Sequence, residues 1–264
     1  MPHYFLVNKP LGATPLEALE QLRREQGIDA SVPMTYAGRL DPMAEGLLLI
    51  LVGDECKKKE QYLGLDKEYE IEVLLGISSD TGDVLGKIKR VNDDLISNDK
   101  IPSQFSEQVI QEKLKLLVGK RLEKYPAYSS KPVDGKPLFM HAREVALGGG
   151  NFNDIEMPEK EIEIYSIDFL GMYEISKHEL VETAIGRISK VKGDFRQEEI
   201  LSLWKQLLQD EVETRGQFQI IKLKVHASSG AYMRTLAEKL GESFGMRALA
   251  WSIKRTKIGD FTLQ

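Results

Sequence analysis

Hydrophobic and polar residues follow both strand and helix periods along this chain. From Lys67 to Leu75, apolar side chains occupy every second position, which predicts a strand with one buried face. Less regular patterns predict further strands at residues 3–7, 161–170 and 219–227, and an apolar run covers 47–52. Apolar residues three and four positions apart predict amphipathic helices at residues 14–26, 106–118, 176–190, 194–213 and 231–244.

The first of these helices carries clear end signals. Thr14 stands at the expected N-cap, Pro15 at the first helical position and Glu17 where it closes a capping box. Gly27 is placed to end the helix. Its apolar side is expected to consist of Leu16, Leu19 and Leu22.

Strands and helices mix without the regular strand–helix alternation of a doubly wound sheet. No glycine-rich phosphate loop follows a strand, and no internal repeat occurs. Residues 36–46 and 125–150 are rich in turn-forming residues and are expected to be loops. The pattern therefore predicts an α+β fold with a sizeable sheet.

Composition narrows the class of protein. The chain has 264 residues, of which 42% are hydrophobic, so it can bury a core. It has no apolar run long enough to span a membrane and no signal-peptide pattern, and Cys56 is its single cysteine, so we expect a cytoplasmic protein without disulfides. Its four histidines are scattered, which argues against a metal site. The net charge of −5 argues against nucleic acid unless a basic groove lies on an acidic body.

The most informative segment is residues 36–48, Tyr-Ala-Gly-Arg-Leu-Asp-Pro-Met-Ala-Glu-Gly-Leu-Leu. An aspartate before a proline is common turn chemistry and by itself predicts only a bend. The flanking residues point further, because Gly-x-Leu-Asp-Pro-x-Ala-x-Gly-x-Leu resembles the catalytic motif of pseudouridine synthases. The resemblance places Asp41 in the position of the one essential aspartate.

Further stretches agree in order and spacing with one branch, the TruB family of tRNA pseudouridine synthases. They are residues 8–12 (Asn-Lys-Pro-Leu-Gly), 67–70 (Lys-Glu-Tyr-Glu), 75–86, 126–143 and 229–236 (Ser-Gly-Ala-Tyr-Met-Arg-Thr-Leu). The resemblance implies a pseudouridine synthase fold, with a mixed, mainly antiparallel sheet flanked by helices. It implies one catalytic domain over residues 1–264, with a thumb-like insertion at residues 125–152 that grips RNA.

The same resemblance implies roles for four side chains around Asp41. Arg234 is similar to the arginine that pairs with the catalytic aspartate, and Tyr69 to the tyrosine that stacks on the uracil. Ile253 takes the place of an apolar residue that lines the uracil pocket. Tyr232 either exchanges a proton at C5 or only shapes that pocket.

The implied reaction suits these residue types. Pseudouridine formation cuts the N1–C1′ bond of a uridine and rejoins the base through C5, so it requires no cofactor, nucleotide or metal. It requires an ionised carboxylate that either attacks the sugar or removes its 2′ proton. Because desolvation opposes the charge of a buried carboxylate, a cation such as Arg234 is needed to keep Asp41 ionised.

Substrate binding must also extrude the uridine from its stack. The residues expected to bind the RNA are Lys9, Tyr36, Arg39, Lys131, Lys136 and Arg143. The lysine run 57–59 is either part of that surface or an ordinary solvated face.

The chain departs from the family pattern in four places. Tyr36 replaces a histidine that fills the gap left by the flipped base, and we expect its ring to keep that role. Arg39 makes the motif Gly-Arg-Leu-Asp, which is typical of the branches that modify rRNA. A helical hairpin at residues 172–216 has no counterpart in the family core. The chain ends at Gln264, without the C-terminal PUA-type RNA-binding domain.

Three functions therefore stay open at this stage. The first is a monomeric tRNA pseudouridine synthase that binds the T-arm and modifies the T-loop uridine at position 55 through Asp41. The second is a pseudouridine synthase with another RNA target, and the third is an RNA-binding or RNA-folding module of the same fold.

Overall fold

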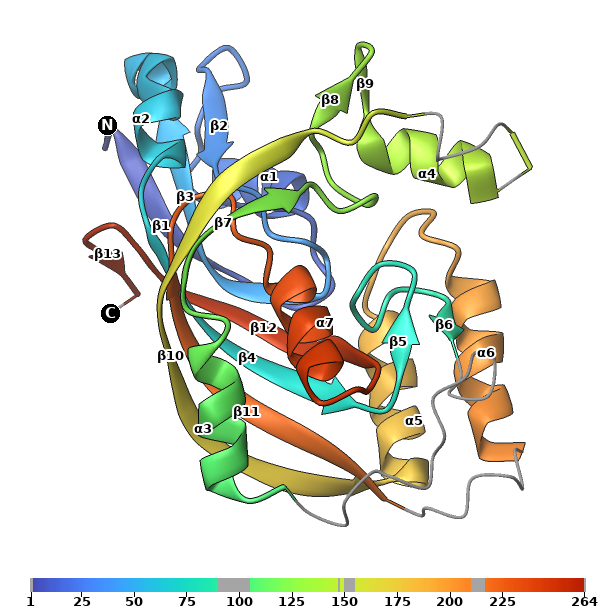
Figure 1. The fold of residues 1–264 in the computed structure, drawn as a ribbon. Helices are drawn as coiled ribbons and strands as arrows, with labels where there is room; N and C mark the ends of the chain where they lie inside the picture. The colour runs from blue at the N-terminus through green and yellow to red at the C-terminus, as the bar shows by residue number, and fades with distance from the viewer. Residues whose placement is uncertain (1, 90–104, 147, 150–154, 210–216, 264) are drawn as a thin grey trace.

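The computed structural model describes residues 2–89, 105–146, 148–149, 155–209 and 217–263. Its centre is a strongly curved sheet with the strand order β1-β3-β12-β4-β11-β10-β7, which β2 extends at β3 and β13 at β12 (Figure 1). Every pairing within it is antiparallel except that between β3 and β12. The strands of this sheet are β1 (Tyr4–Lys9), β2 (Met34–Ala37), β3 (Ala44–Val52), β4 (Lys67–Leu75), β7 (Gly119–Lys124), β10 (Glu159–Ser176), β11 (Gln217–Ala227), β12 (Ala248–Ile258) and β13 (Phe261–Thr262).

Helices and two small ribbons complete the described part of the fold. The helices are α1 (Pro15–Glu25), α2 (Lys59–Leu63), α3 (Glu107–Lys115), α4 (Leu138–Ala146), α5 (Lys177–Ile188), α6 (Gln197–Gln209) and α7 (Met233–Ser243), with a short 3-10 helix η1 (Gly53–Lys58). The ribbons pair β5 (Ser78–Ser79) with β6 (Ile88–Lys89) and β8 (Pro132–Val133) with β9 (Lys136–Pro137). The expected α+β class with a mixed, mainly antiparallel sheet is confirmed.

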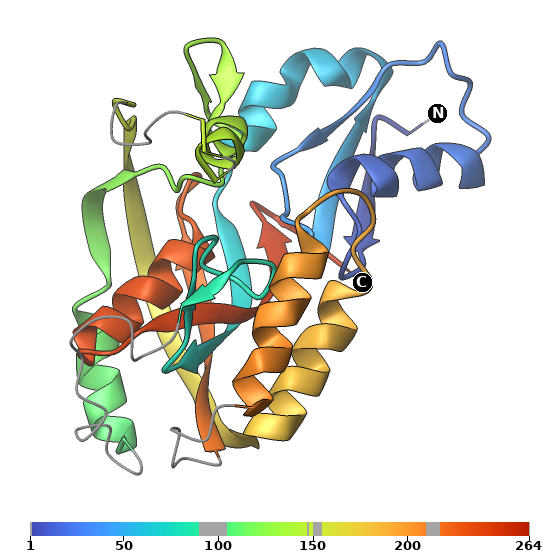
Figure 2. The same cartoon turned by 90° about the vertical axis from the view of Figure 1, so that its right-hand side faces the viewer.

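Strand β4 shows how the sheet is covered. Its residues Ile71, Val73 and Leu75 belong to the core cluster that includes α3 and α7, whereas Leu74 belongs to the cluster that includes α5 and α6. Successive side chains of a strand point to opposite faces. The far end of β4 is therefore buried on both faces, although the alternating pattern predicted one. Figure 2 shows the α5–α6 pair standing at that end of the sheet.

The local signals of α1 act as expected. The Glu17 backbone N donates to Thr14 Oγ1 at 3.2 Å, and the Thr14 backbone N donates to the Glu17 carboxylate at 2.7 Å, which is a complete capping box. Leu19 and Leu22 are buried, but Leu16 is 58% exposed. Leu16 was therefore wrongly placed on the buried side, since at about 100° per residue it lies to one side of the stripe formed by Pro15, Ala18, Leu19 and Leu22.

Three segments differ from the sequence-based prediction. Residues 36–46 contain the end of β2 and the start of β3, and residues 125–150 contain the β8–β9 ribbon and α4 instead of an unbroken loop. Strand β12 had no predicted counterpart, because four consecutive buried residues at its start, 248–251, hide the alternation. Strands as short as β2, β8 and β9 are stabilised by their partner strands, so their sequences show only weak alternation.

The hairpin begins later than expected. Residues 172–176 are the last part of β10, which continues past an irregularity between Phe169 and Gly171. This irregularity breaks the period of two, and the strand therefore seemed to end at 170. The expected hairpin also included residues 210–216, and the expected thumb residues 147 and 150–152; these lie outside the described residues. No helix in the described ranges is long and apolar enough to cross a membrane.

Candidate active site

The Asp41 motif forms the turn between β2 and β3, and a buried arginine from β12 holds it. Arg255 is 1% exposed. It donates from Nε to the Leu47 carbonyl at 2.8 Å and from its two Nη atoms to the carbonyls of Arg39 and Gly38 at 3.2 and 3.1 Å. The backbone of the Asp41 motif is thus fixed to the last long strand of the chain. No role was predicted for Arg255 from the sequence.

Asp41 meets Arg234 at the open end of this turn. Arg234 Nε lies 2.9 Å from Asp41 Oδ2, and the side chains are 4% and 39% exposed respectively. Arg234 stands in the first turn of α7, directly after Tyr232 at its N-cap and Met233 in the core. The pairing expected from sequence is present: the carboxylate faces solvent and the cation behind it is buried.

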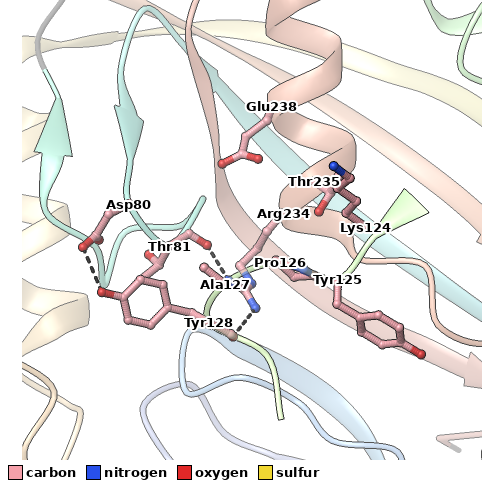
Figure 3. Close-up of a pocket in the computed structure, with 10 residues that line it drawn as sticks. All are labelled: Asp80, Thr81, Lys124, Tyr125, Pro126, Ala127, Tyr128, Arg234, Thr235 and Glu238. Carbon is pink, nitrogen blue, oxygen red and sulfur yellow. Dashed lines mark hydrogen bonds between the residues drawn. The ribbon is translucent and has the colours of Figure 1, made fainter. Parts of the chain in front are cut away.

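Two backbone carbonyls fix the rest of the guanidinium. Nη1 of Arg234 donates to the Thr81 carbonyl, and Nη2 donates to the Tyr128 carbonyl at 3.0 Å. Figure 3 shows the side chain running from α7 between the segments that carry these carbonyls (Figure 3). Thr81 precedes Gly82 in the loop after β5, and Tyr128 belongs to the thumb-like insertion, so three distant parts of the chain meet at one side chain.

A second carboxylate, Asp83, lies behind the pair. Asp83 Oδ2 is 4.0 Å from Arg234 Nε, and its Oδ1 accepts from the Thr81 hydroxyl at 2.8 Å and the Leu85 backbone N at 3.0 Å. Burial raises the pKa of Asp83 to about 6, although the Arg234 cation opposes the shift. Asp83 lies within the stretch 75–86 that resembles the family, but no role was predicted for it from the sequence.

One tyrosine ring lies beside Arg234, and a second tyrosine shares a core cluster with a residue of the motif. Tyr69, 9% exposed, belongs to the same core cluster as Leu40 of the motif and Ile253. The Tyr232 ring lies 5.9 Å from Arg234 Cζ and 6.1 Å from the Tyr125 ring. Burial, and then the Asp41 charge, raise the pKa of Tyr232 to about 12. Its phenol is therefore a very weak acid that keeps its proton near neutral pH, so it can donate a hydrogen bond but does not act as a base there.

A cavity of about 250 Å³ opens beside Arg234. Its wall consists of Asp80, Thr81, the thumb segment 124–128, Arg234, Thr235 and Glu238 (Figure 3). Tyr125 and Tyr128 extend in opposite directions from that thumb segment. The cavity therefore places polar backbone and two tyrosines next to the arginine that pairs with Asp41.

The binding residues expected near the motif occupy different environments. Arg39 is exposed, and Tyr36 is partly buried beside α1 with Lys59 Nζ 5.7 Å from its ring centroid. Lys9 is fully buried and donates to the carbonyls of Pro10 and Ala13 at 3.0 and 2.7 Å. Burial lowers the pKa of Lys9 to about 8. Lys9 therefore organises the loop after β1 and is not at the surface where RNA contact was expected.

The expected basic residues of the thumb are already engaged in part. Lys131 Nζ lies 5.3 Å from the Tyr125 ring centroid, and Lys136 pairs with Glu144. Arg143 donates to the Asp194 carbonyl and stacks 5.6 Å from the Phe195 ring, both in the loop of the inserted hairpin. Arg143 was expected to grip RNA; in this structure its contacts are to the hairpin.

The lysine run 57–59 divides between exposed Lys57 and Lys58 and partly buried Lys59, whose ammonium lies over the Tyr36 ring. Lys57 and Lys58 pair with Asp54 and Glu55 one helical turn earlier, at 2.7 and 3.1 Å. In the part of the chain that the structure describes, no cluster of three His, Cys, Asp or Glu side chains has the arrangement of a metal site.

Comparison with known proteins identifies the family. The model of the TruB family pseudouridylate synthases (N-terminal domain) matches residues 31–187, more than half of the chain. The chain belongs to this family. Among curated relatives, the tRNA pseudouridine synthase B of Aromatoleum aromaticum is 28% identical over 98% of this chain and 63% of its own length. That of Chloroherpeton thalassium is 25% identical over 98% of this chain and 84% of its own.

The solved structures agree on the fold. A Cbf5-Nop10-Gar1 complex contains a chain that matches with a TM-score of 0.57 at 15% identity, over 99% of this chain and 50% of that one. A chain of an H/ACA RNP bound to a substrate RNA with 2′-deoxyuridine matches with a TM-score of 0.52 at 14% identity, over 99% of this chain and 49% of that one. This TruB-family chain spans less than two thirds of the length of most of the curated relatives it matches.

Proposed function

We propose that this protein is a tRNA pseudouridine synthase that isomerises the T-loop uridine at position 55, with Asp41 as the essential carboxylate. The observation that carries the proposal is the ion pair between solvent-facing Asp41 and buried Arg234, 2.9 Å apart, inside a motif of the matched family. The names of the curated relatives, tRNA pseudouridine synthase B, support the choice of tRNA as substrate.

The arrangement suits the chemistry of the exchange. The N1–C1′ bond breaks, the uracil turns, and a C5–C1′ bond forms; the proton on C5 leaves and N1 gains one. Asp41 is placed to act at the sugar, by attack at C1′ or removal of the 2′ proton. Arg234 stabilises its charge without blocking it, since only Nε faces the carboxylate. The protonated Tyr232 phenol shapes the pocket beside it.

Substrate binding must offset the cost of extruding the uridine, a few kcal/mol. Tyr69 on β4 offers an aromatic face, and stacking a base on such a ring is worth about 1–3 kcal/mol. Exposed Arg39 lies within the motif, two positions before Asp41, where it can enter the space that the flipped base leaves.

The test is tritium release from C5 of labelled uridine. The purified protein is incubated with an unmodified tRNA transcript and with the same transcript carrying cytidine at position 55. Release from the first and not from the second supports the proposal. Equal release from both contradicts position 55 as the target.

A second target class is tested in the same assay, because Arg39 gives the motif the Gly-Arg-Leu-Asp form of the rRNA-modifying branches. An rRNA hairpin transcript is the third substrate. Release from this hairpin alone would replace tRNA by rRNA in the proposal. Tight binding of tRNA without release from any substrate would indicate an RNA-folding module.

A further inference from the structure

The loop of the inserted hairpin, residues 189–196, reaches the residues behind the Asp41–Arg234 pair. Its last residue is Arg196, directly before α6. Arg196 Nη1 lies 2.7 Å from Asp80 Oδ2 and Nη2 3.3 Å from Oδ1, so the guanidinium engages both oxygens. Its Cζ lies 4.8 Å from the Tyr128 ring centroid, and the Tyr128 hydroxyl donates to Asp80 Oδ2 at 3.2 Å. Arg196 thus joins Asp80 to Tyr128.

These two partners belong to the two segments that orient Arg234. Asp80 is adjacent to Thr81, whose carbonyl accepts from Nη1 of Arg234, and the Tyr128 carbonyl accepts from Nη2. Figure 3 shows the Tyr128 ring directed at Asp80, and Thr81 and Tyr128 on either side of the Arg234 head (Figure 3). If Asp80 and Tyr128 separate, the two carbonyls move, and the guanidinium moves relative to Asp41.

The link is not an ordinary surface ion pair. Exposed pairs of long side chains contribute little, because solvent screens them and they lose rotamer freedom. Here the side chains of Arg196 and Asp80 are only 16% and 23% exposed, the contact is two-pronged, and the ring of Tyr128 covers one face of the guanidinium. A planar guanidinium held in this way has a defined orientation.

The backbone of the loop is built to present Arg196. Its φ of +61° lies in the left-handed region, which costs free energy for a residue with a side chain. The conformation is held within the loop: the Arg196 backbone N donates to Asp194 Oδ1 at 3.3 Å, and the Gln197 amide bridges Phe195 N and the Gly193 carbonyl at 2.8 and 2.7 Å. Strain maintained in this way is typical of positions with a functional task.

We propose that Arg196 is a positioning residue for catalysis. Through Asp80 and Tyr128 it fixes the carbonyls of residues 81 and 128, and through them it holds Arg234 in place against Asp41. The inserted hairpin thereby becomes a working part of the active site. The inference rests on the proposed pseudouridine synthase activity.

The test compares Arg196→Ala with Lys205→Ala, which removes the same charge from an exposed position on the same hairpin. We expect Arg196→Ala to lower kcat by about 10- to 100-fold, the effect of a small misplacement of a reacting group. KM and the RNA dissociation constant are expected to stay within about twofold, since the Arg196 side chain binds Asp80 and Tyr128 and none of the residues proposed to contact RNA. Lys205→Ala is expected to keep wild-type values of all three.

A double-mutant cycle with Asp80→Asn tests the route of the effect. If Arg196 acts through Asp80, the double variant loses no more kcat than the worse single variant. If the kcat losses of the two single variants multiply in the double variant, Arg196 does not act through Asp80. A rise in KM or in the RNA dissociation constant at unchanged kcat contradicts positioning, because it assigns Arg196 to direct RNA contact. Arg196→Lys keeps the charge without the two-pronged contact, and an intermediate kcat supports the proposal, while a wild-type kcat contradicts it.

A readout without substrate separates this inference from the proposed function. Solvent exchange of the Arg234 Nε proton, followed by ¹⁵N NMR, is expected to be at least about tenfold faster in Arg196→Ala than in the wild type, because the guanidinium is less well held. Unchanged exchange contradicts the positioning role. A wild-type protein without turnover on any RNA contradicts the proposed function alone, and the exchange rate then still decides the role of Arg196.

Discussion

At the scale of single residues, the site depends on one cation shared between two carboxylates. Arg234 faces Asp41 at 2.9 Å and Asp83 at 4.0 Å, and both Nη atoms bind backbone carbonyls. Asp83 is buried and hydrogen-bonded, whereas Asp41 is 39% exposed. The same arginine therefore anchors a structural carboxylate and orients one that is open to substrate. The two carboxylates differ in role because Asp83 is buried and Asp41 is partly exposed.

Replacing Asp41 by asparagine keeps the side-chain shape and removes its charge and nucleophilic oxygen. We expect tritium release to fall by at least roughly 1,000-fold, because the neutral amide can neither attack C1′ nor remove the 2′ proton. The melting temperature is expected to change little, because Asp83 remains beside Arg234. Binding of the tRNA transcript serves as the control and should stay near wild type. Appreciable turnover in this variant would remove Asp41 from the proposed role.

Asp83 makes stability depend on pH in a defined direction. Its pKa rises from 3.8 to about 6 on folding, so the folded protein binds this proton more readily than the unfolded chain. The contribution of the protonated carboxyl is present below about pH 4 and is lost as the pH rises through about 6. The loss amounts to about 3 kcal/mol in unfolding free energy.

Asp83→Asn keeps acceptors for Thr81 and Leu85 but cannot ionise. We expect its unfolding free energy, relative to wild type, to rise by up to about 3 kcal/mol between pH 4 and pH 7. Urea titrations at several pH values measure this difference. A difference that does not vary with pH would show that Asp83 does not titrate in this range.

At the scale of elements, the parallel pairing of β3 with β12 depends on a glycine. Gly46 lies opposite Arg255 in this pairing and has a φ of +101°. A Cβ added there would lie 2.3 Å from the Arg255 carbonyl oxygen, a backbone atom that cannot turn away. The glycine allows the two strands to approach, and this approach brings the Arg255 side chain to the catalytic motif.

Gly46→Ala is therefore expected to be strongly destabilising. Gly53 provides a matched control, since it also has a positive φ, of +63°, but no atom lies within 4 Å of an added Cβ. We expect Gly53→Ala to cost about 1–2 kcal/mol of unfolding free energy from backbone strain alone. Gly46→Ala should cost at least about 2 kcal/mol more because of the clash. Chemical denaturation compares the two, and equal losses would contradict the close approach.

At the scale of the whole molecule, the site is assembled from both ends and the middle of the chain. Asp41 comes from the turn before β3, the two carbonyl-bearing segments from the middle, and Arg234 and Arg255 from the last two long elements. The net charge of −5 is a sum over the entire surface. RNA affinity is then expected to come from local cations. In the thumb-like insertion, the lysines differ in whether their charge is already paired.

Lys131 and Lys136 differ in what they already contact. Lys136 pairs with Glu144, whereas Lys131 lies over the Tyr125 ring, where its ammonium can still meet a phosphate. We expect Lys131→Ala to weaken tRNA binding and to lower the slope of log affinity against log salt by about 0.7–0.9. Lys136→Ala should change both less, because its charge is already neutralised. Binding curves at several salt concentrations measure the slopes, and a larger effect at Lys136 would reverse this ranking.

Local chemistry in the sequence was enough to predict much of this protein. The capping box at Thr14, the alternation of 67–75 and the Asp41 motif are short-range patterns, and the structure contains the helix, the strand and the turn that they indicate. The resemblance to the family also predicted the pairing of Asp41 with Arg234. The helix, the strand and the turn could be predicted because each depends on residues that are close together in the sequence.

Tertiary structure alone decided the remainder. Strand β12, the burial of Lys9 and the contact of Arg143 with the hairpin depend on partners far along the chain, and no local period records them. Arg196 lies in none of the sequence motifs that resembled the family, so no role was predicted for it. Its neighbours Asp80 and Tyr128 are 116 and 68 positions away, and only the packing of the hairpin on the sheet brings these charges and rings into contact.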